Sequence, residues 1–324
     1  QRRYCCHNCG KRFAEPNVFL PKYHRMTSRL ISSVIKKLSD ERSYTSVARE
    51  TGLSVSTVIR IFDHIQYPHI KTCPAVLSID EFKGNTGGEK FNVILCDPQT
   101  KRVLDILPKR KEGYLIDYFK KTDRSRVEFF VSDMWTTYKE IAESFFRGAT
   151  FLVDKYHWIR QITWAFENVR KSEQKKFSSS HRRYFKRSKS LLNKRFNSLN
   201  DQQKTHVNVM LYASPTLSRA YFYKEDFLNI LSCNSREEAQ KQLIKWINSA
   251  SVCGIEAFEK CAKTMLNWIN GILNSFTTPY TNGFTEGCNN KIKVLKRNAY
   301  GYRNFSRFRN RILHIFSNKR QATA

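Results

Sequence analysis

The chain has 324 residues, of which 57 are lysine or arginine and 28 are aspartate or glutamate, so its formal net charge is +29. Apolar residues make up 40% of the chain, which is enough for a buried core and argues against a disordered protein. So large a positive surplus indicates a polyanionic partner such as nucleic acid, and no apolar run is long enough to predict a membrane span.

A cysteine motif opens the chain. Cys6-x-x-Cys9 is followed at once by a glycine, and such a turn presents two thiolates, which is half of a tetrahedral zinc site. No second pair follows, so we expect residues 1–25 to form a partial zinc-binding knuckle; the alternative is a small turn that contains cysteines. The remaining candidate ligands within the chain are Cys5, His7 and His24. The other cysteines are scattered, which argues against a disulfide framework and favours a cytoplasmic protein.

Residues 26–70 have the pattern of a helix-turn-helix domain. Apolar residues recur at helical spacing over 26–38, and a shorter helix ends near Ala48 before a turn at Gly52. Ser54 is placed to cap a second helix. The side chains of this helix predicted to point inward are Val55, Val58, Ile59 and Phe62. The side chains predicted to face DNA, where they read bases or hold phosphates, are Ser54, Ser56, Thr57 and Arg60.

Residues 75–155 change to short apolar runs separated by turns, the pattern of a small sheet. The predicted elements are strands over 74–82, 90–97 and 101–108, a helix over 112–122, a strand over 126–133, a helix over 136–147 and a strand over 149–154. The first three strands form an antiparallel meander. The order β-β-β-α-β-α-β is the layout of the ribonuclease H-like fold, so we expect an α/β protein with a mixed sheet.

The remainder of the chain is helical and basic. Residues 156–276 predict a large all-helical insertion, and residues 277–324 return to the main domain with a helix from Thr285 and a basic helix at the end. The cations predicted to contact DNA are Arg182, Arg183, Lys186 and Arg187 in the insertion and Lys291, Lys293, Lys296, Arg297 and Arg303 in the last segment. A solvated charged face is the alternative for each group.

Three acids stand out by their position. Asp80 lies on the first predicted strand, Asp133 ends the fourth, and Glu286 begins a helix. The first and fourth strands are neighbours in this fold, so two of the acids meet at one end of the sheet and a helix across that end brings the third. Each has an ordinary alternative: Asp80 has Glu81 as a rival, Asp133 is placed to cap the next helix, and Glu286 is a first-turn acid favoured by the helix dipole.

Three carboxylates at one point repel each other, and divalent cations remove this cost. Mg²⁺ prefers carboxylate oxygens together with water and phosphate. Two such ions about 3.5–4 Å apart clamp the attacking and leaving oxygens of a phosphoryl displacement. In a chain this basic, the pattern indicates metal-dependent chemistry on DNA by Asp80, Asp133 and Glu286.

Several segments together resemble a known family. They are SIDEF, VSDMW, VDKYHW and the long stretch YTNGFTEGCNNKIKVLKRNAYGYRNF, of which the last is the most specific. In these motifs the chain resembles the DDE transposases of bacterial insertion sequences, and among them the group often called the ISL-three family. The resemblance covers nearly the whole chain.

The resemblance implies a bacterial enzyme that binds the terminal inverted repeats of its element. It implies that Asp80, Asp133 and Glu286 are catalytic and bind two Mg²⁺ or Mn²⁺, that water attacks at the element ends, and that the freed 3′-hydroxyl attacks target DNA. A homodimer or larger assembly follows, since two ends must be joined. Asp154 and His157 match a further family motif, in which His157 either touches the scissile phosphate or packs at a helix start. The family's upstream zinc-ligand pair is missing here.

The residues leave three other interpretations open. One is a sequence-specific regulator, which needs no acidic triad. Another is a nuclease of the ribonuclease H-like fold, which cuts but does not join ends. The third is a decayed transposase that binds without cutting.

Overall fold

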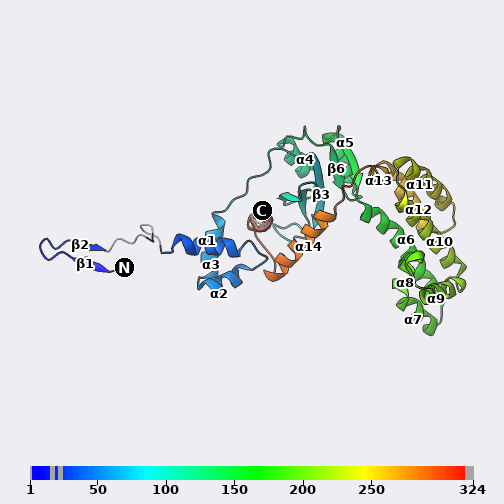
Figure 1. The fold of residues 1–324 in the computed structure, drawn as a ribbon, viewed down its shortest axis with the longest axis horizontal. Coiled ribbons are helices and arrows are strands. Elements are labelled where there is room, and N and C mark those ends of the chain that lie inside the picture. Colours follow the sequence, from blue (N-terminus) through cyan, green and yellow to red (C-terminus); the bar gives the residue numbers. More distant parts are fainter. Residues whose placement is uncertain (1, 15–18, 21–24, 318–324) are drawn as a thin grey trace.

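The computed structural model describes residues 2–14, 19–20 and 25–317 of the chain. They form a short hairpin, a three-helix unit, a five-stranded sheet with helices, and an array of helices before the last segment returns to the sheet (Figure 1). The candidate zinc ligand His24 lies outside the described residues.

The strands are β1 (Arg3–Cys5), β2 (Arg12–Ala14), β3 (Val76–Phe82), β4 (Asn92–Asp97), β5 (Arg102–Leu107), β6 (Phe129–Ser132) and β7 (Thr150–Val153). The helices up to the insertion are α1 (Ser28–Lys37), α2 (Tyr44–Thr51), α3 (Val55–Asp63), α4 (Glu112–Lys120) and α5 (Thr136–Phe145). The later helices are α6 (Lys155–Lys176), α7 (Ser179–Arg187), α8 (Lys189–Asn193), α9 (Asp201–Tyr212), α10 (Pro215–Asn229), α11 (Arg236–Ser251), α12 (Glu256–Asn267), α13 (Ile269–Asn274), α14 (Gly283–Asn298) and α15 (Phe305–Ser317).

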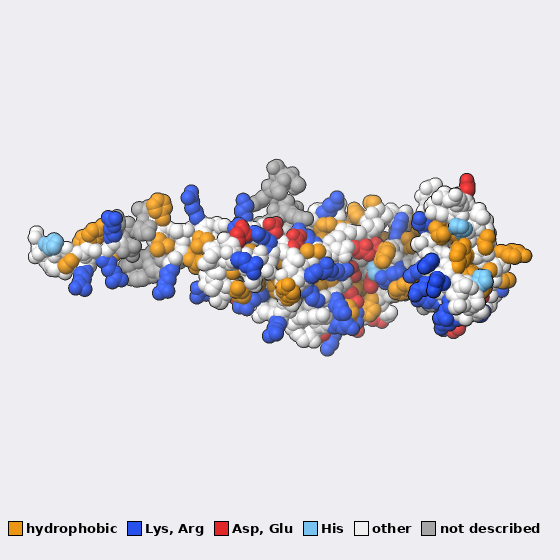
Figure 2. Space-filling model, turned by 90° about the horizontal axis from the view of Figure 1, so that it is seen from below, with side chains coloured by type: hydrophobic (Ala, Val, Ile, Leu, Met, Phe, Trp, Pro, Cys, Tyr) orange, Lys and Arg blue, Asp and Glu red, His pale blue; other side chains and the backbone are white. Residues whose placement is uncertain are grey.

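Basic side chains are spread along the length of the molecule (Figure 2). Over the ranges that the structure describes, no helix is both long enough and apolar enough to cross a membrane.

The unit of α1, α2 and α3 has a core of its own, in which Val34, Val47 and Phe62 are fully buried. α2 ends at Gly52, whose φ of +67° lies in the left-handed region that favours glycine. Ser54 caps α3 by accepting a hydrogen bond from the backbone N–H of Thr57. The spacing, the turn and the cap together form the predicted helix-turn-helix.

One predicted core position of α3 is wrong. Val55 is 37% exposed, whereas Ile61, which the prediction left out, is 6% exposed. Val55 is the first residue of the helix, so no earlier turn covers it. The buried stripe runs instead through Val58, Ile61 and Phe62, at the spacing of one helical face.

The sheet has the strand order β5-β4-β3-β6-β7. β3 pairs antiparallel with β4, and β4 with β5, whereas β6 pairs parallel with both β3 and β7. The predicted mixed sheet is therefore confirmed, together with the prediction that its first and fourth strands are neighbours. Parallel pairs need crossover connections, which α4 and α5 supply.

Helices cover both faces of the sheet. α4 and α5 pack on the face to which Leu77 and Ile79 of β3 point. α14 and α15 pack on the other face, against Phe82 and Ile94. Successive strand residues point to opposite faces, so Asp80 faces α14 along with Phe82.

The helices α6–α13 form a second large core. Phe227 lies at its centre, with its ring centroid 5.6 Å from that of Trp158 and 4.8 Å from that of Trp246. α13 returns the chain to β7, and Gly271 permits this approach, because an added Cβ would lie 2.6 Å from Cγ2 of Val153. Both ends of the insertion therefore meet at one edge of the sheet.

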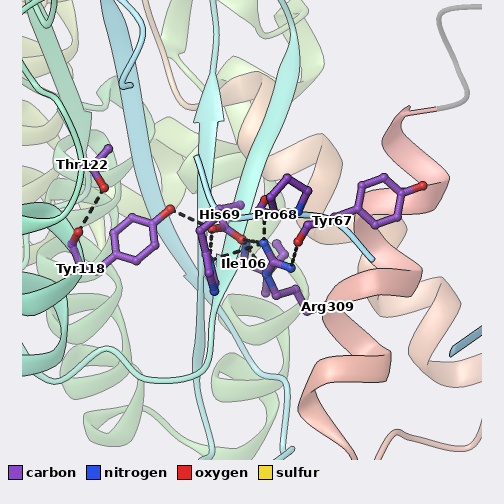
Figure 3. Close-up of polar contacts among 8 residues, drawn as sticks. Tyr67, Pro68, His69, Ile106, Tyr118, Thr122 and Arg309 are labelled. Carbon is purple, nitrogen blue, oxygen red and sulfur yellow. Dashed lines mark hydrogen bonds and ion pairs between the residues drawn. The ribbon is translucent and has the colours of Figure 1, made fainter. Parts of the chain in front are cut away.

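A buried ionic cluster ties α15 to the sheet (Figure 3). Asp105 of β5 is fully buried and accepts hydrogen bonds from Nε of Arg309 and from the hydroxyl of Tyr118, each at 2.7 Å. Nδ1 of His69 lies 2.6 Å from the same carboxylate. Arg309 also donates to the backbone carbonyls of residues 67–68, in the segment that leaves the helix-turn-helix unit. The buried charge is thus surrounded by donors, as its stability requires.

α15 also contacts the helix-turn-helix unit itself. Arg311 is fully buried and donates to three backbone carbonyls within residues 38–42, just after α1. Its guanidinium lies 5.4 Å from the ring centroid of Phe62. Arg307 forms an ion pair with Asp63 at 2.7 Å, in which both side chains stay partly exposed.

Replacing Arg311 by methionine removes the donors from these buried carbonyls and keeps most of the side-chain volume. We expect the free energy of unfolding to fall by about 2–4 kcal/mol, because a buried unsatisfied acceptor costs about 1–3 kcal/mol. Thermal or denaturant unfolding measures the loss. The matched change Arg307→Met, in an exposed pair on the same helix, should cost about 1 kcal/mol or less. Equal losses in the two variants would contradict the role assigned to Arg311.

Candidate active site

Asp80 lies on β3, and Asp133 directly follows β6, the parallel neighbour of β3. β3 and β6 pair with Ser78 opposite Val131, and the same register continued by two residues sets Asp80 opposite Asp133. The two carboxylates are close enough for the charge of Asp133 to raise the pKa of Asp80. The structure therefore brings these two predicted residues together at one end of the strand pair.

Asp80 is buried and hydrogen-bonded. Its Oδ1 accepts from the backbone N–H of Glu81 at 2.7 Å, and its Oδ2 accepts from Nδ2 of Asn289 on α14 at 2.9 Å. Burial, with the nearby acidic charges adding to it, raises the pKa of Asp80 to about 7. The rival, Glu81, is paired with a cation, because both of its carboxylate oxygens accept from Arg110, at 2.7 and 2.8 Å.

Asp133 has a buried oxygen without a partner. Its Oδ1 is closed to solvent and has no hydrogen-bond donor within the described residues. Burial raises the pKa of Asp133 to about 6, and the charge of Glu81 contributes to the rise. The N-cap residue of α5 is Trp135, so Asp133 is not the cap of that helix. A buried carboxylate oxygen that lacks a donor is a position suited to a cation.

Glu286 lies in the first turn of α14, next to the start of α6. Glu286, Asp154 and His157 each offer one ligand atom, and these three atoms lie within 4.8 Å of one another. Within the described residues this is the one compact group of three possible metal ligands, and neither Asp80 nor Asp133 belongs to it. The charge of Glu286 nevertheless raises the pKa of Asp80, so the two acids are neighbours in one site.

The surroundings of the second group, which consists of Glu286, Asp154 and His157, shift the pKa values of two of its members. Burial raises the pKa of Glu286, and the charge of Asp154 adds to the rise. Burial lowers the pKa of His157, with the charge of Arg160 adding to the effect, so the imidazole is neutral at neutral pH. A neutral imidazole keeps a lone pair for a metal or a hydrogen bond.

Polar contacts hold α14 across the end of the sheet. The hydroxyl of Ser78 donates to Oδ1 of Asn282 at 2.6 Å and lies 2.8 Å from Oγ1 of Thr285. The backbone N–H of Asn282 donates to Oδ1 of Asp154 at 2.9 Å. Asp154 is also the N-cap residue of α6, since its side chain accepts a hydrogen bond from the backbone N–H of Tyr156. Asp154 therefore joins the starts of the two helices that carry the second group.

Sequence reasoning missed Arg160 and Asn289. The charge of Arg160 lowers the pKa of both Asp133 and Glu286, so this guanidinium lies among the acids. Helical spacing was an available signal for both residues: Arg160 follows His157 by three positions, and Asn289 follows Glu286 by three.

The cysteine motif forms the tip of the β1–β2 hairpin. The backbone N–H of Gly10 donates to the carbonyl of Cys6 at 2.9 Å and closes the turn. The backbone N–H groups of Cys9 and Asn8 lower the pKa of the Cys6 thiol, as suits a metal ligand. No third ligand groups with Cys6 and Cys9 among the residues that the structure describes.

The predicted DNA-facing residues of α3 lie at its start. Ser54, Ser56 and Arg60 are exposed, and Thr57 is half-buried. Ser54 is engaged as the helix cap, with Oγ 3.2 Å from the backbone nitrogen of Thr57. Ser56 and Arg60 remain on the open surface of the helix.

The basic residues of α14 and its surroundings divide into two groups. Lys291 forms an ion pair with Glu41 at 2.7 Å, and Lys296 donates to the backbone carbonyl of Lys83 at 2.7 Å, so both hold the helix to the rest of the chain. The exposed cations among those predicted are Lys293, Arg297 and Arg303 here and Arg182, Arg183, Lys186 and Arg187 on α7.

Comparison with known proteins places the chain in a family. The ISL3 model for DDE enzymes, described as Transposase, matches residues 77–312, and a second model, described as the helix-turn-helix domain of transposase family ISL3, matches residues 15–66. The transposase for insertion sequence element IS1001 of Bordetella parapertussis is 26% identical over 314 residues, which cover 94% of this chain and 77% of that protein.

Shorter matches cover about a third of the chain. The transposase for insertion sequence element IS1557 of Mycobacterium tuberculosis is 30% identical over 105 residues, 32% of this chain and 23% of that protein. A protein of Lactococcus lactis subsp. lactis named ATP-dependent protease is 33% identical over 107 residues, 33% of each chain. The transposase model, by contrast, spans the sheet, the insertion and α14 together. The chain belongs to the ISL3 family of DDE transposases and is an insertion-sequence transposase with a DNA-binding helix-turn-helix domain.

Proposed function

We propose that this enzyme binds the terminal inverted repeats of its insertion sequence, hydrolyses DNA at the element ends and joins the freed 3′-hydroxyl to target DNA. Asp80, Asp133 and Glu286 are the proposed catalytic residues. The observation that carries the proposal is the buried, donor-free Oδ1 of Asp133 next to the carboxylate of Asp80. Burial disfavours the ionised state of both carboxylates, and a cation between them would stabilise that state.

The donor set fits hard divalent cations, since carboxylate oxygens are the ligands that Mg²⁺ and Mn²⁺ prefer. Asp80 and Asp133 would hold one ion, and Glu286, with Asp154 and His157 beside it, the second. When bound, such ions stabilise the charge on the attacking and leaving oxygens of a phosphoryl displacement.

The chain's own groups would orient the substrate. Arg160 lies among the acids and is proposed to bind a non-bridging oxygen of the scissile phosphate. Its NH2 group lies 3.2 Å from Nδ1 of His157, so the histidine positions this guanidinium. Asn289 fixes the orientation of Asp80 through its hydrogen bond to Oδ2.

The helix-turn-helix unit would recognise the repeats through the start of α3, with Ser56 and Arg60 at the bases and Ser54 and Thr57 nearer the phosphates. α15 holds this unit against the sheet, which would keep a bound repeat in a constant position relative to the acids. Two ends must be joined, so a homodimer or larger assembly is proposed. The enzyme would act where the bacterial chromosome lies, in the cytoplasm.

We assign the sheet to the ribonuclease H-like fold, which its strand order and its alternation with helices support. The proposed domains are the helix-turn-helix unit over 26–70, the catalytic domain over 75–155 and 277–324, and the helical insertion over 156–276. Residues 1–25 would form half of a zinc knuckle, which a second ligand pair must complete.

Cleavage of a supercoiled plasmid carrying the element ends tests the catalytic assignment. With Mg²⁺ or Mn²⁺, Asp80→Asn, Asp133→Asn and Glu286→Gln should each lower cleavage by more than about 100-fold, because each removes a metal-binding oxygen. The control Asp117→Asn, an exposed acid on α4, should cut like the wild type. Binding without cutting by the wild type under either metal would overturn the assignment, and cutting without joining would reduce the enzyme to a nuclease.

Metal binding should depend on pH. The pKa of Asp80 is about 7 and that of Asp133 about 6, so below pH 6 the metal-free protein holds both protons and a metal must displace them. The rise in melting temperature on adding Mn²⁺ should therefore be largest near pH 8 and vanish below about pH 6. Asp80→Asn and Asp133→Asn should each make the rise smaller at every pH, because the group of Glu286, Asp154 and His157 remains intact. A wild-type rise that does not change with pH would contradict this account.

The metal-free protein should show the opposite trend. A carboxyl pKa that is raised in the folded state means that the folded chain binds more protons than the unfolded chain between about pH 4 and 7. These two acids should therefore lower stability as the pH rises through that window. A thermal unfolding series in a chelator, compared with the same series in Mn²⁺, measures the effect.

Arg60→Gln tests end recognition. It should weaken binding to an element-end duplex about tenfold or more and reduce the preference over unrelated DNA, as expected for a lost base contact. The control Lys36→Gln makes the same charge change at an exposed position on α1 and should keep the preference. An equal loss of affinity for the element-end duplex and for unrelated DNA would indicate that Arg60 binds phosphate and does not read bases.

A further inference from the structure

The outer part of the insertion carries a basic hollow. It has a volume of about 560 Å³ and lies between α6 and α7. The α7 residues that line it follow one another at the spacing of a single helical face, so α7 turns one side to the hollow. We call the following set the α6–α7 groove: Lys171, Lys175, Ser179, Arg182, Arg183 and Lys186.

The cations of this groove are not neutralised by the acids nearby. Glu167 is taken by Arg170, with two contacts of 2.6 and 2.7 Å. Glu173 is taken by Lys176 at 2.5 Å and by the hydroxyl of Ser214 at 2.8 Å. Within the described residues, no lysine or arginine of the α6–α7 groove makes an ion pair. Five like charges around one hollow repel each other, and a polyanion relieves that repulsion.

Contacts between the two helices hold the groove in shape. Arg170 is 3% exposed and donates to Oε1 of Gln174 at 2.8 Å and to the backbone carbonyl of Phe185 at 3.3 Å. Gln174 in turn donates to the backbone carbonyl of Arg182 at 2.8 Å. The ring of Phe177 stacks on that of Phe185, with centroids 4.7 Å apart. The cations therefore stand on a rigid base, which lowers the entropy cost of binding.

The groove lies far from the helix-turn-helix unit. α7 lies at one end of the molecule, and α1–α3 lie on the other side of the sheet and α14 (Figure 1). Lysine and arginine side chains also gather at the insertion end in the view from below (Figure 2). If a repeat bound to α3 runs along this order of parts to the acids, the DNA beyond the scissile bond continues toward the insertion.

We propose that the α6–α7 groove binds the sugar-phosphate backbone of duplex DNA on the far side of the scissile bond from the inverted repeat, which is the flanking DNA before cleavage. This inference rests on the proposed cleavage at element ends. A second copy of the chain is a poor occupant, because its 28 acids face 57 lysines and arginines and the two copies repel. The start of α7, with Ser179 as its first residue, adds backbone N–H groups that favour phosphate.

Binding at several salt concentrations tests the proposal with three probes. They are a duplex of the element end with its flank, the same end cut at its terminus, and an unrelated duplex. The triple variant Arg182→Gln, Arg183→Gln, Lys186→Gln should bind the flanked probe more than about tenfold more weakly than the wild type. The slope of the logarithm of its binding constant against the logarithm of the salt concentration should be shallower by about 2–3, because each phosphate contact contributes about 0.9 to that slope. Binding to the cut end should not change.

A matched triple variant controls for bulk charge. Lys241→Gln, Lys245→Gln, Lys263→Gln removes the same charge from exposed positions of α11 and α12 in the same insertion. It should bind the flanked probe like the wild type. Equal losses in the two triple variants, or no loss in the groove variant, would overturn the proposal.

Ser179→Glu keeps the test decisive if the triple variant fails to fold. A carboxylate in the first turn favours the helix, so α7 should form, but its charge repels phosphate in the groove. We expect the same selective loss of flanked-probe binding. Wild-type affinity for that probe in Ser179→Glu would overturn the proposal.

Two further experiments distinguish flanking DNA from target DNA in the groove, and DNA binding by the groove from the proposed cleavage. Unchanged flanked-probe binding with weaker capture of a target plasmid would assign the groove to target DNA and overturn the flank assignment. Asp80→Asn should keep groove-dependent binding while losing cleavage. A wild type that never cuts but shows the groove-dependent slope would overturn the proposed catalysis and leave the groove in place.

Discussion

Arg309 and Arg311 are buried two residues apart on α15, and a buried guanidinium that loses its hydrogen-bond partners is strongly destabilising. Arg309 finds Asp105 in the sheet, and Arg311 finds the carbonyls that follow α1. One helix, α15, therefore joins the DNA-binding unit to the sheet through buried contacts whose loss would lower the free energy of unfolding. The position of α3 relative to the proposed catalytic acids depends on this pair of arginines.

The buried acids of the candidate active site lower the stability of the fold, in contrast to the buried arginines of α15. Burial raises the pKa values of both Asp80 and Asp133, although the charges of Arg160 and Arg110 lower that of Asp133. Holding such a pair in the ionised state costs stability, and a divalent ion bound there, as proposed, would offset that cost. Glu286 lies beside Asp154 and His157 at the start of α6, so α6 and α14 are joined at this group of possible metal ligands. The buried acids lower the stability of the fold at the candidate active site, and the buried hydrogen bonds of α15 offset this cost.

The surplus of positive charge is also organised. Lys291 and Lys296 serve as internal contacts of the fold, whereas the cations of the α6–α7 groove make no ion pair within the part of the chain that the structure describes. A net charge of +29 is thus partly structural and partly available to DNA. This division explains why composition alone indicates a polyanionic partner but does not say which lysines and arginines meet it.

The sequence by itself determined the local pieces: the helix-turn-helix through apolar spacing, Gly52 and Ser54, the strands through short apolar runs, and the family through its motifs. Only the tertiary structure decided that Glu81 turns to Arg110 while Asp80 turns to α14, that Val55 stays exposed, and that Arg160 lies among the acids. Periodicity reports which residues share a face but not what that face meets. Asn289 reaches Asp80 across 209 positions of the chain, and no local pattern encodes a contact between two surfaces so far apart in sequence.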